Sequence, residues 1–468
     1  MTTIEPTRTP SADGVEHAAL LARLRAVHAT GRTRSASWRV RQLEAIERLV
    51  DQCESEIAAA LNADLGRSPV EAWLGDIAPT KAEAAYARKR VRAWMLPRPK
   101  TLSLNQLPAV GWVQYEPLGT ALIIGPWNYP AYLTLSPLVA AVAAGNCAVV
   151  KPSELAPATS ALLADLIPKY LDPDAVAVVE GDASVTQSLI ALGFDHVLFT
   201  GGTEVGRRIM AAAAPTLTPV VLELGGKSPV IVDADADLDV VARRLAWVKL
   251  LNSGQTCIAP DYVLVEASVR DALVEKLTRV IGEFLAAETN PAMRIINERQ
   301  FDRLESYLAT SSGSFAVGGG AYRDTLTIEP TVIVDPSVDD PVMTEETFGP
   351  ILPVITVDCV DTAFEFVRSR PKPLGAYLFS RSIAVQRRFL SRVSAGGAVI
   401  NHIGMHVLAP QLPFGGVGDS GMGGYHGRYG FETLSHRKSV LLKPQRPDLR
   451  LVYPPYTATA LKVMRKLF

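Results

Sequence analysis

Short apolar runs alternate with stretches of helical length between residues 120 and 222, and this alternation constrains the fold more than any other feature of the chain. Strands that alternate with helices predict a parallel sheet with helices on both faces. Right-handed crossovers bring the carboxyl ends of such strands to one edge of the sheet, where ligands bind. The predicted strands are residues 120–124, 147–150, 175–179, 196–199 and 220–222.

Polar residues follow the ends of these predicted strands. Because parallel strands end at a common edge, we expect the polar side chains to lie close together and to form a ligand site there. The residues are Asn128, Lys151, Glu154, Gly201, Gly202, Thr203 and Glu223.

The segment of residues 117–150 contains no charged residue, which makes a membrane segment one interpretation. Glycine and proline residues divide it into pieces that fall short of the roughly 20 apolar residues of a spanning helix, and interior prolines break helices. We therefore favour a buried strand, a loop and a buried helix.

The chain before this sheet is predicted to be mainly helical. Apolar residues recur at helical spacing in residues 15–29, 43–61 and 77–94. Ser37 is a candidate for the start of the second of these helices, and Gly66 is a candidate for its end.

A hairpin is predicted over residues 102–119, with residues 111–115 as its second arm. From about Gly226 the strand–helix pattern begins again with residues 229–232, and it continues to about Gly415. This length is sufficient for a second α/β domain with its own core.

Charge and cysteine usage narrow the class of protein. The formal net charge is −1, from 47 basic and 48 acidic side chains, so nucleic acid is not indicated as the main partner. The 4 cysteines lie far apart without a CxxC pair, which predicts no zinc site and fits a reducing compartment. Residues 1–13 lack an apolar signal-peptide core and are predicted to be a disordered leader.

Cys257 is the candidate nucleophile. It lies in a polar segment that contains glycine, residues 252–257, whereas Cys147 lies in an aliphatic run. A thiolate attacks carbonyl carbon readily. A loop cysteine without a function is the alternative.

Glu223 is the candidate general base. It ends the apolar run of residues 220–222, where partial desolvation would raise its pKa toward the range of a useful base. An equally good interpretation at this point is a buried acid that pairs with Lys227.

Other polar residues suggest sites that bind a nucleotide or stabilise an oxyanion. Each of them also has a purely structural interpretation. Asn128, in a loop bracketed by prolines, offers an amide donor or is simply a turn residue. Lys151 and Glu154 suit ribose hydroxyls or a solvated turn. The two glycines before a helix at residues 199–206 suit a pyrophosphate, although they do not form GxGxxG. In residues 345–350 an acid and an aromatic residue lie two positions apart, which suits a ribose and a nicotinamide ring, or else a surface acidic turn.

The segments GPWNYP, KPSE, FTGGTEVG, ELGGKSP, NSGQTC, EETFGP and PFGGVGDSGMGGYHG occur in this order. Together they resemble the aldehyde dehydrogenase superfamily, from about Trp38 to Tyr456. The last segment and the end of the chain, residues 453–456, are similar to the class 3 branch.

The resemblance implies a role for each matching residue. Cys257 matches the nucleophile, Glu223 the general base and Asn128 the oxyanion-hole amide. The family uses no metal ion in catalysis, and the sequence contains no metal-binding motif, so the two agree. The residues that match cofactor contacts are Trp127, Lys151, Glu154, Gly201, Gly202, Thr203, Glu204, Val205, Gly206, Glu346 and Phe348.

The resemblance also implies the reaction. An aldehyde would be oxidised to a carboxylic acid through a thiohemiacetal and a thioester at Cys257, which Glu223-activated water hydrolyses. NAD is the expected cofactor, with NADP possible, because the Glu154 carboxylate should repel a 2′-phosphate. Medium- or long-chain aliphatic or aromatic aldehydes are the expected substrates. A thiol acyltransferase or thioesterase, or a non-catalytic relative, is the alternative.

The implied organisation is an α/β fold with a parallel Rossmann-like NAD-binding domain, residues 1–101 and 118–226, and an α/β catalytic domain, residues 227–415. Residues 102–117 and 416–468 would form a small oligomerisation element and tail of a cytoplasmic homodimer. The basic end of the chain is too short to span a membrane. A helix packed on the fold is expected there, and weak attachment to a membrane surface is the alternative. Residues 283–293 are short compared with relatives.

Overall fold

A six-stranded sheet organises the first half of the chain. In the computed structural model, which describes residues 12–287, 294–448 and 450–467, its strands run in the order β17-β7-β6-β3-β4-β5. All neighbours are parallel except β17, which runs antiparallel to β7. The strands are β3 Thr120–Ile124, β4 Cys147–Lys151, β5 Val176–Val178, β6 His196–Thr200, β7 Val220–Glu223 and β17 Gly421–Met422.

The predicted parallel strands are confirmed, because β3, β4 and β6 are buried along their whole length and therefore read as unbroken apolar runs. The uncharged segment forms β3, a loop, a helix buried at every residue and β4, as predicted. In the described ranges, no helix combines the length and apolar character needed to cross a membrane. The connecting helices are α6 Tyr132–Ala144, α7 Pro157–Tyr170, α8 Ala183–Ala191 and α9 Thr203–Ala213.

The N-terminal helices differ from the prediction in their limits. The second predicted helix is two helices that meet at Cys53, and its N-cap is Ser35 rather than Ser37, because the Ser35 hydroxyl accepts from the backbone N–H of Trp38. Gly66 ends the pair with a left-handed φ of 75°. Residues 1–11 of the predicted leader lie outside the described residues. The helices are α1 Ala12–Ala29, α2 Ala36–Gln52, α3 Glu54–Leu65, α4 Pro69–Ala72 and α5 Ala78–Trp94, with a π-helical turn at Trp73–Ile77.

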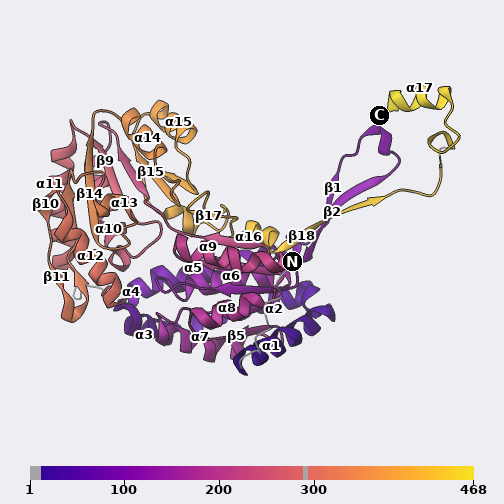
Figure 1. Cartoon of the computed structure of the whole chain (residues 1–468), viewed down its shortest axis with the longest axis horizontal. Coiled ribbons are helices and arrows are strands. Elements are labelled where there is room, and N and C mark those ends of the chain that lie inside the picture. Colours follow the sequence, from indigo (N-terminus) through magenta and orange to yellow (C-terminus); the bar gives the residue numbers. More distant parts are fainter. Residues whose placement is uncertain (1–11, 288–293, 449, 468) are drawn as a thin grey trace, which may run out of the picture.

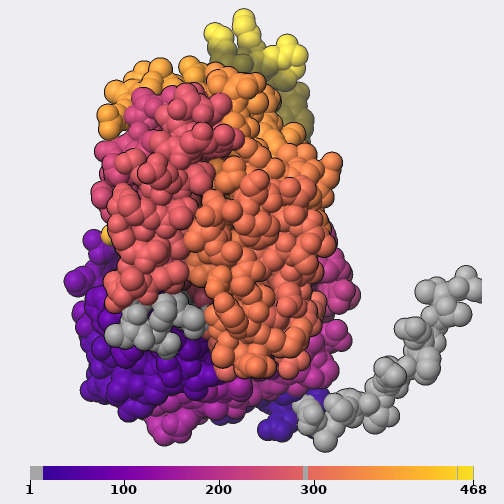
Figure 2. Space-filling view, turned by 90° about the vertical axis from the view of Figure 1, so that its left-hand side faces the viewer, coloured from indigo at the N-terminus to yellow at the C-terminus, as the bar shows by residue number. Residues whose placement is uncertain are grey.

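A seven-stranded sheet organises the second half, in the order β10-β13-β14-β9-β8-β15-β16. Its strands are parallel except β10, which is an antiparallel edge. Figure 2 shows this unit, red to orange, above the indigo and magenta first unit. The strands are β8 Pro229–Val232, β9 Tyr262–Glu266, β10 Ser314–Val317, β13 Thr331–Val334, β14 Ile351–Val357, β15 Gly375–Phe379 and β16 Gly397–Ile400.

Helices cover both faces of this second sheet, and a two-stranded ribbon lies beside it. Of residues 283–293, α11 includes those up to Ala287, and residues 288–293 lie outside the described residues. The helices are α10 Leu238–Leu250, α11 Arg270–Ala287, α12 Glu298–Thr310, α13 Pro341–Thr344, α14 Val360–Arg368 and α15 Ile383–Arg392, and the ribbon is β11 Ala321–Tyr322 with β12 Thr327–Ile328.

A three-stranded antiparallel sheet forms an arm that extends from the first unit (Figure 1). It consists of β1 Arg98–Lys100, β2 Val110–Pro117 and β18 Ser435–Leu442. The predicted hairpin was wrong about its first arm, because β1 lies in the proline-rich segment before residue 102. An edge strand tolerates Pro99, which has no N–H to donate.

The C-terminal part of the chain contributes to several units. β17 completes the first sheet, while α16 Gly427–Thr433 leads into β18. The predicted packing of the last helix on the fold was wrong: α17 Ala458–Leu467 lies beyond the arm (Figure 1), and Leu461 and Val463 on it are exposed. Much of its apolar side therefore stays exposed, although Ala460 is buried.

Candidate active site

The segment that presents Cys257 is a tightly held loop after α10. Asn252 and Ser253 adopt left-handed backbone angles, with φ of 53° and 50°, which asparagine tolerates better than most residues. The side chain of Gln255 donates to the Asn252 carbonyl oxygen at 3.1 Å and accepts from the backbone N–H of Ile296 at 3.0 Å. Backbone of this unusual form, held from both sides, is typical of functional sites.

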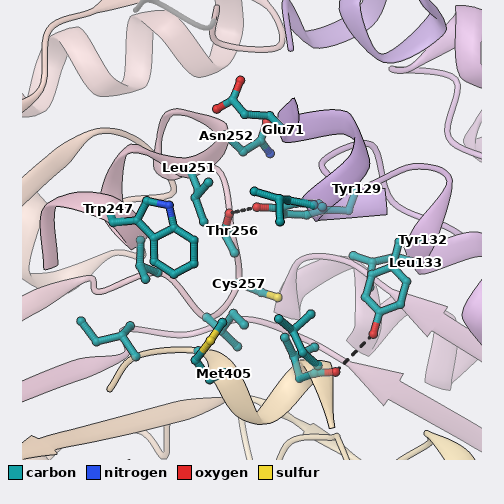
Figure 3. Close-up of a pocket in the computed structure, with 18 of the residues that line it drawn as sticks. Glu71, Tyr129, Tyr132, Leu133, Trp247, Leu251, Asn252, Thr256, Cys257 and Met405 are labelled. Atoms are coloured by element: carbon teal, nitrogen blue, oxygen red, sulfur yellow. Dashed lines mark hydrogen bonds between the residues drawn. The ribbon is translucent and has the colours of Figure 1, made fainter. Parts of the chain in front are cut away.

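Cys257 faces a largely apolar cavity with about 930 Å³ of space, part of it open solvent. Figure 3 shows its sulfur in the middle of the lining side chains, below the hydrogen-bonded hydroxyls of Tyr129 and Thr256, which lie 2.7 Å apart. Such a cavity favours an apolar ligand with its reactive end at the thiol. The apolar lining includes Leu74, Leu133, Trp247, Leu251, Met405 and Leu408.

Glu223 ends β7 with a fully buried side chain, and neither carboxyl oxygen has a hydrogen-bond partner among the described residues. Burial raises the pKa of Glu223 to about 8, and the nearby Cys257 thiol and Thr200 hydroxyl offset part of this rise. The alternative of a pair with Lys227 is wrong. The Lys227 ammonium instead binds Asp261 and donates to the carbonyl oxygens of Val342 and Glu345, at 2.8 Å each.

The thiol and the carboxyl group influence each other although they come from the two different sheets. Burial, followed by the charges of Glu223 and Glu346, raises the pKa of Cys257 well above its ordinary value. Both groups therefore carry their protons at neutral pH in this state of the protein, and Glu223 ionises first as pH rises.

Asn128 lies opposite the Cys257 loop and is 3% exposed. Its side-chain amide donates to the Gln255 carbonyl oxygen at 3.1 Å. An amide nitrogen carries two N–H groups, so a second donor remains for a ligand at Cys257.

The predicted cofactor residues of the first sheet do gather at its carboxyl edge. At the end of β4, the Lys151 ammonium and the Glu154 carboxylate are 2.7 Å apart, with Lys151 buried and Glu154 exposed. Gly201 and Gly202 connect β6 to α9. At Gly202 an added Cβ would meet only open space, so a ligand can approach the backbone there.

The first turn of α9 completes this edge. Gly206 in α9 packs so closely against the residue that follows β7 that an added Cβ would lie 2.7 Å from Leu224. The Thr203 hydroxyl donates to the Asp419 carbonyl oxygen at 3.1 Å, Glu204 pairs with Arg208 at 3.3 Å, and Val205 is exposed. The N-terminus of a helix of this length favours a negatively charged group.

Trp127, from the first unit, and Phe348, from the second, meet edge to face with ring centres 5.3 Å apart. Phe348 has a left-handed φ of 45°. Glu346 lies against Gly225, and burial, then Asp261, raises the pKa of Glu346 to about 8 despite opposing groups. The contact of Trp127 with Phe348 therefore joins the two units, and the charge of Glu346 acts on the Cys257 thiol.

Sequence reasoning missed the residues that hold this second segment. The Arg303 guanidinium donates to the carbonyl oxygens of Glu346 and Thr347 at 2.9 Å, and the Asp261 carboxylate accepts from the Thr347 backbone N–H at 2.9 Å. It also missed the buried ion pair of Arg67 and Asp76 beside Asn128. The contacts of Arg303 and Asp261 join distant parts of the chain, and no local pattern indicates that Arg67 and Asp76 are buried together.

This edge fits a nicotinamide dinucleotide. An ammonium and a carboxylate suit ribose hydroxyls, an open glycine before a helix suits the pyrophosphate, and the aromatic pair suits a flat ring. The buried Glu223 carboxyl group lies close to the Cys257 thiol. In the described part of the chain, no cluster of side chains could hold a metal ion.

Comparison with known proteins decides the family. The sequence model of the aldehyde dehydrogenase family matches residues 3–440. The chain belongs to this family. The mouse aldehyde dehydrogenase family 3 member A2 is 45% identical over 92% of the chain and 90% of its own length. The dimeric NADP-preferring aldehyde dehydrogenase of the dog is 42% identical over 93% of the chain and 97% of its own length.

Among solved structures, the substrate-bound state of Staphylococcus aureus AldH superposes with a TM-score of 0.92, at 40% identity, covering 96% of this chain and 99% of that one. The resemblance to the aldehyde dehydrogenase superfamily and its class 3 branch is thereby confirmed, as is the two-unit α/β fold. The chain is an aldehyde dehydrogenase, an oxidoreductase that oxidises aldehydes with NAD(P).

Proposed function

We propose that this aldehyde dehydrogenase uses Cys257 as its nucleophile and Glu223 as the base that activates water. One observation carries the proposal: a thiol from one unit and a partner-free buried carboxyl group from the other meet beside an apolar cavity. Because the pKa of this carboxyl group is about 8, its ionised form is an effective base once the pH approaches that value.

The Cys257 thiol gives up its proton to solvent, the resulting thiolate attacks the aldehyde carbon, and the carbonyl oxygen becomes an oxyanion. The free N–H of the Asn128 amide stabilises this charge, and one such donor typically lowers the barrier by about 3–4 kcal/mol. Bound NAD(P) supplies the acceptor for the hydride that leaves the carbon. Glu223 then takes a proton from water, whose oxygen attacks the thioester carbon, and the Cys257 thiolate departs as the acid is released.

The cofactor residues keep their predicted roles in this proposal. Lys151 and Glu154 bind the adenosine ribose, and the turn and helix start formed by Gly201, Gly202, Thr203, Glu204, Val205 and Gly206 lie under the pyrophosphate. Trp127, Glu346 and Phe348 border the nicotinamide side. The exposed Glu154 carboxylate favours NAD through repulsion of a 2′-phosphate, with NADP accepted less well.

The cavity supports medium- or long-chain aliphatic and aromatic aldehydes as substrates, because its lining is mainly apolar. The test is an assay with NAD or NADP and a panel of aldehydes of increasing chain length, including benzaldehydes, in which absorbance reports reduced cofactor. The proposal expects turnover to rise with chain length. Ester cleavage without cofactor reduction would support a thioesterase instead. A lack of turnover across the whole panel would support a non-catalytic relative.

The pH dependence of turnover follows from the pKa of Glu223. Because burial places this pKa at about 8, the fraction of charged carboxylate grows as pH rises through that value. We expect kcat to rise between about pH 7 and pH 9 and then to level off. Steady-state rates over this range check the prediction, and a profile without a slope there would contradict the role of Glu223.

We propose that two copies form a homodimer through the arm and that the enzyme works in the cytoplasm. β18 is an edge strand, and Leu441, Leu442 and Val110 on the arm are exposed. The 4 cysteines are all free, which suits a reducing compartment.

Sedimentation should give the mass of a pair of 50.3 kDa chains, and the change Leu441→Asp with Leu442→Asp should yield single chains. A wild-type protein that sediments as one chain would contradict the dimer. Cell fractionation tests the location.

A further inference from the structure

We propose that Arg67 is a positioning residue that fixes the Asn128 amide against the Cys257 loop. The inference rests on the proposed function, since it concerns the oxyanion donor of that reaction. Arg67 follows α3, and its side chain is 1% exposed. Its guanidinium binds the Asp76 carboxylate, the backbone carbonyl oxygen of Asn128, and the side-chain oxygen of Asn252 at 3.2 Å.

Asp76 anchors Arg67 to the segment that follows Asn128. The fully buried Asp76 carboxylate accepts from the backbone N–H groups of Ala131 at 3.0 Å and Tyr132 at 2.8 Å. Between these points, the Arg67 guanidinium lies 4.2 Å from the centre of the Tyr129 ring, a cation–π contact. One ion pair therefore holds the loop at Asn128 itself and at its junction with α6.

Asn252 extends the connection to the second unit. Its side-chain amide donates to the Asn128 carbonyl oxygen at 2.9 Å and to the Gln255 carbonyl oxygen at 3.0 Å. Because the Asn128 amide itself donates to Gln255, the bonds close a ring between the two loops. With one N–H fixed in this ring, the direction of the other is fixed as well.

The arrangement requires the planar fork of arginine. A guanidinium presents N–H groups to three acceptors in fixed directions, whereas a lysine ammonium is a point charge on a flexible stem. The change Arg67→Lys keeps a charge beside the buried Asp76 carboxylate, so it avoids leaving that carboxylate unpaired. It removes the fork and thereby loosens the amide.

The experiment compares Arg67→Lys, Asn128→Ala and the double variant in full-length enzyme. We expect Asn128→Ala to lower kcat/KM for an aldehyde about 10²–10³-fold, and Arg67→Lys about 10–10²-fold. The double variant should be no slower than Asn128→Ala alone, since Arg67 acts through that amide. As a matched control, Arg279→Lys exchanges an exposed arginine and should leave the rate unchanged.

Alkylation of Cys257 by iodoacetamide, measured without cofactor, separates positioning from general damage. This displacement forms no oxyanion, so Arg67→Lys should leave its rate at the wild-type value. The inference would be overturned if Arg67→Lys lowered kcat/KM by the same factor in the wild type and in Asn128→Ala. It would also be overturned if Arg67→Lys slowed alkylation as much as it slowed aldehyde oxidation. If Asn128→Ala has no effect, the proposed function fails instead.

A second variant keeps the test decisive if Arg67→Lys does not fold. Asn252→Gly removes the side chain that joins the two loops, and glycine adopts the left-handed φ of 53° without strain. The buried Arg67 guanidinium loses one hydrogen bond but keeps its ion pair with Asp76. The same pattern is expected: slower aldehyde oxidation, no further loss beside Asn128→Ala, and unchanged alkylation; additive losses would contradict it.

Discussion

The change Cys257→Ala is expected to lower kcat/KM for aldehyde oxidation by at least about 10⁴-fold, because it removes the atom that bonds to the substrate. The thiol lies in the apolar cavity (Figure 3), and its replacement by a methyl group leaves the hydrogen bonds of the loop in place. Fold and cofactor binding should therefore survive. Absorbance of the reduced cofactor measures the loss, and titration of the variant with NAD measures binding.

The chain offers a matched control in Cys359. It is also a free cysteine, but it is exposed at the start of α14 in the second unit. Cys359→Ala should keep wild-type kinetics. Aldehyde oxidation that survives Cys257→Ala within about tenfold would show that another group forms the covalent bond.

The change Glu223→Gln is expected to separate the two halves of the reaction. Glutamine has nearly the same shape but cannot take a proton, so water is no longer activated and the thioester persists. We expect steady-state turnover to fall about 10²–10⁴-fold. The first turnover should remain as a burst of about one reduced cofactor per site, visible by stopped-flow absorbance.

Hydroxylamine provides the control for this variant. It attacks a thioester without the help of a base, so it should restore part of the lost turnover in Glu223→Gln and have little effect on the wild type. A variant without a burst, or one that hydroxylamine does not rescue, would place Glu223 in an earlier step than hydrolysis.

The sheet edge could be predicted from the sequence because its strands have a simple signature. Strands buried on both faces, such as β3 and β4, are unbroken apolar runs, so the polar residues that follow them stand out. Glu223 and Lys151 therefore lie where the alternation of strands and helices placed them. The chemistry assigned to each depended on the resemblance to a family.

The supporting residues could not be predicted in the same way. Arg67 and Asp76 are charged residues in a helical region, and charged residues are ordinarily exposed. Their burial depends on partners such as Asn252, which lies far along the chain and in the other unit. The limits of β1 and the position of α17 could not be predicted. They depend on which strand edges and which surfaces of the folded protein are left free to contact them. The domain limits remain a prediction.

Mass spectrometry of the Glu223→Gln variant tests the central claim most directly. The variant is mixed with an aldehyde and NAD, quenched after one turnover and digested. The account predicts that the acyl group replaces the thiol hydrogen of Cys257, so the peptide that contains it gains the mass of the aldehyde less two hydrogen atoms. An unmodified Cys257 in protein that has reduced its cofactor, or an acyl group on a different residue, would contradict it.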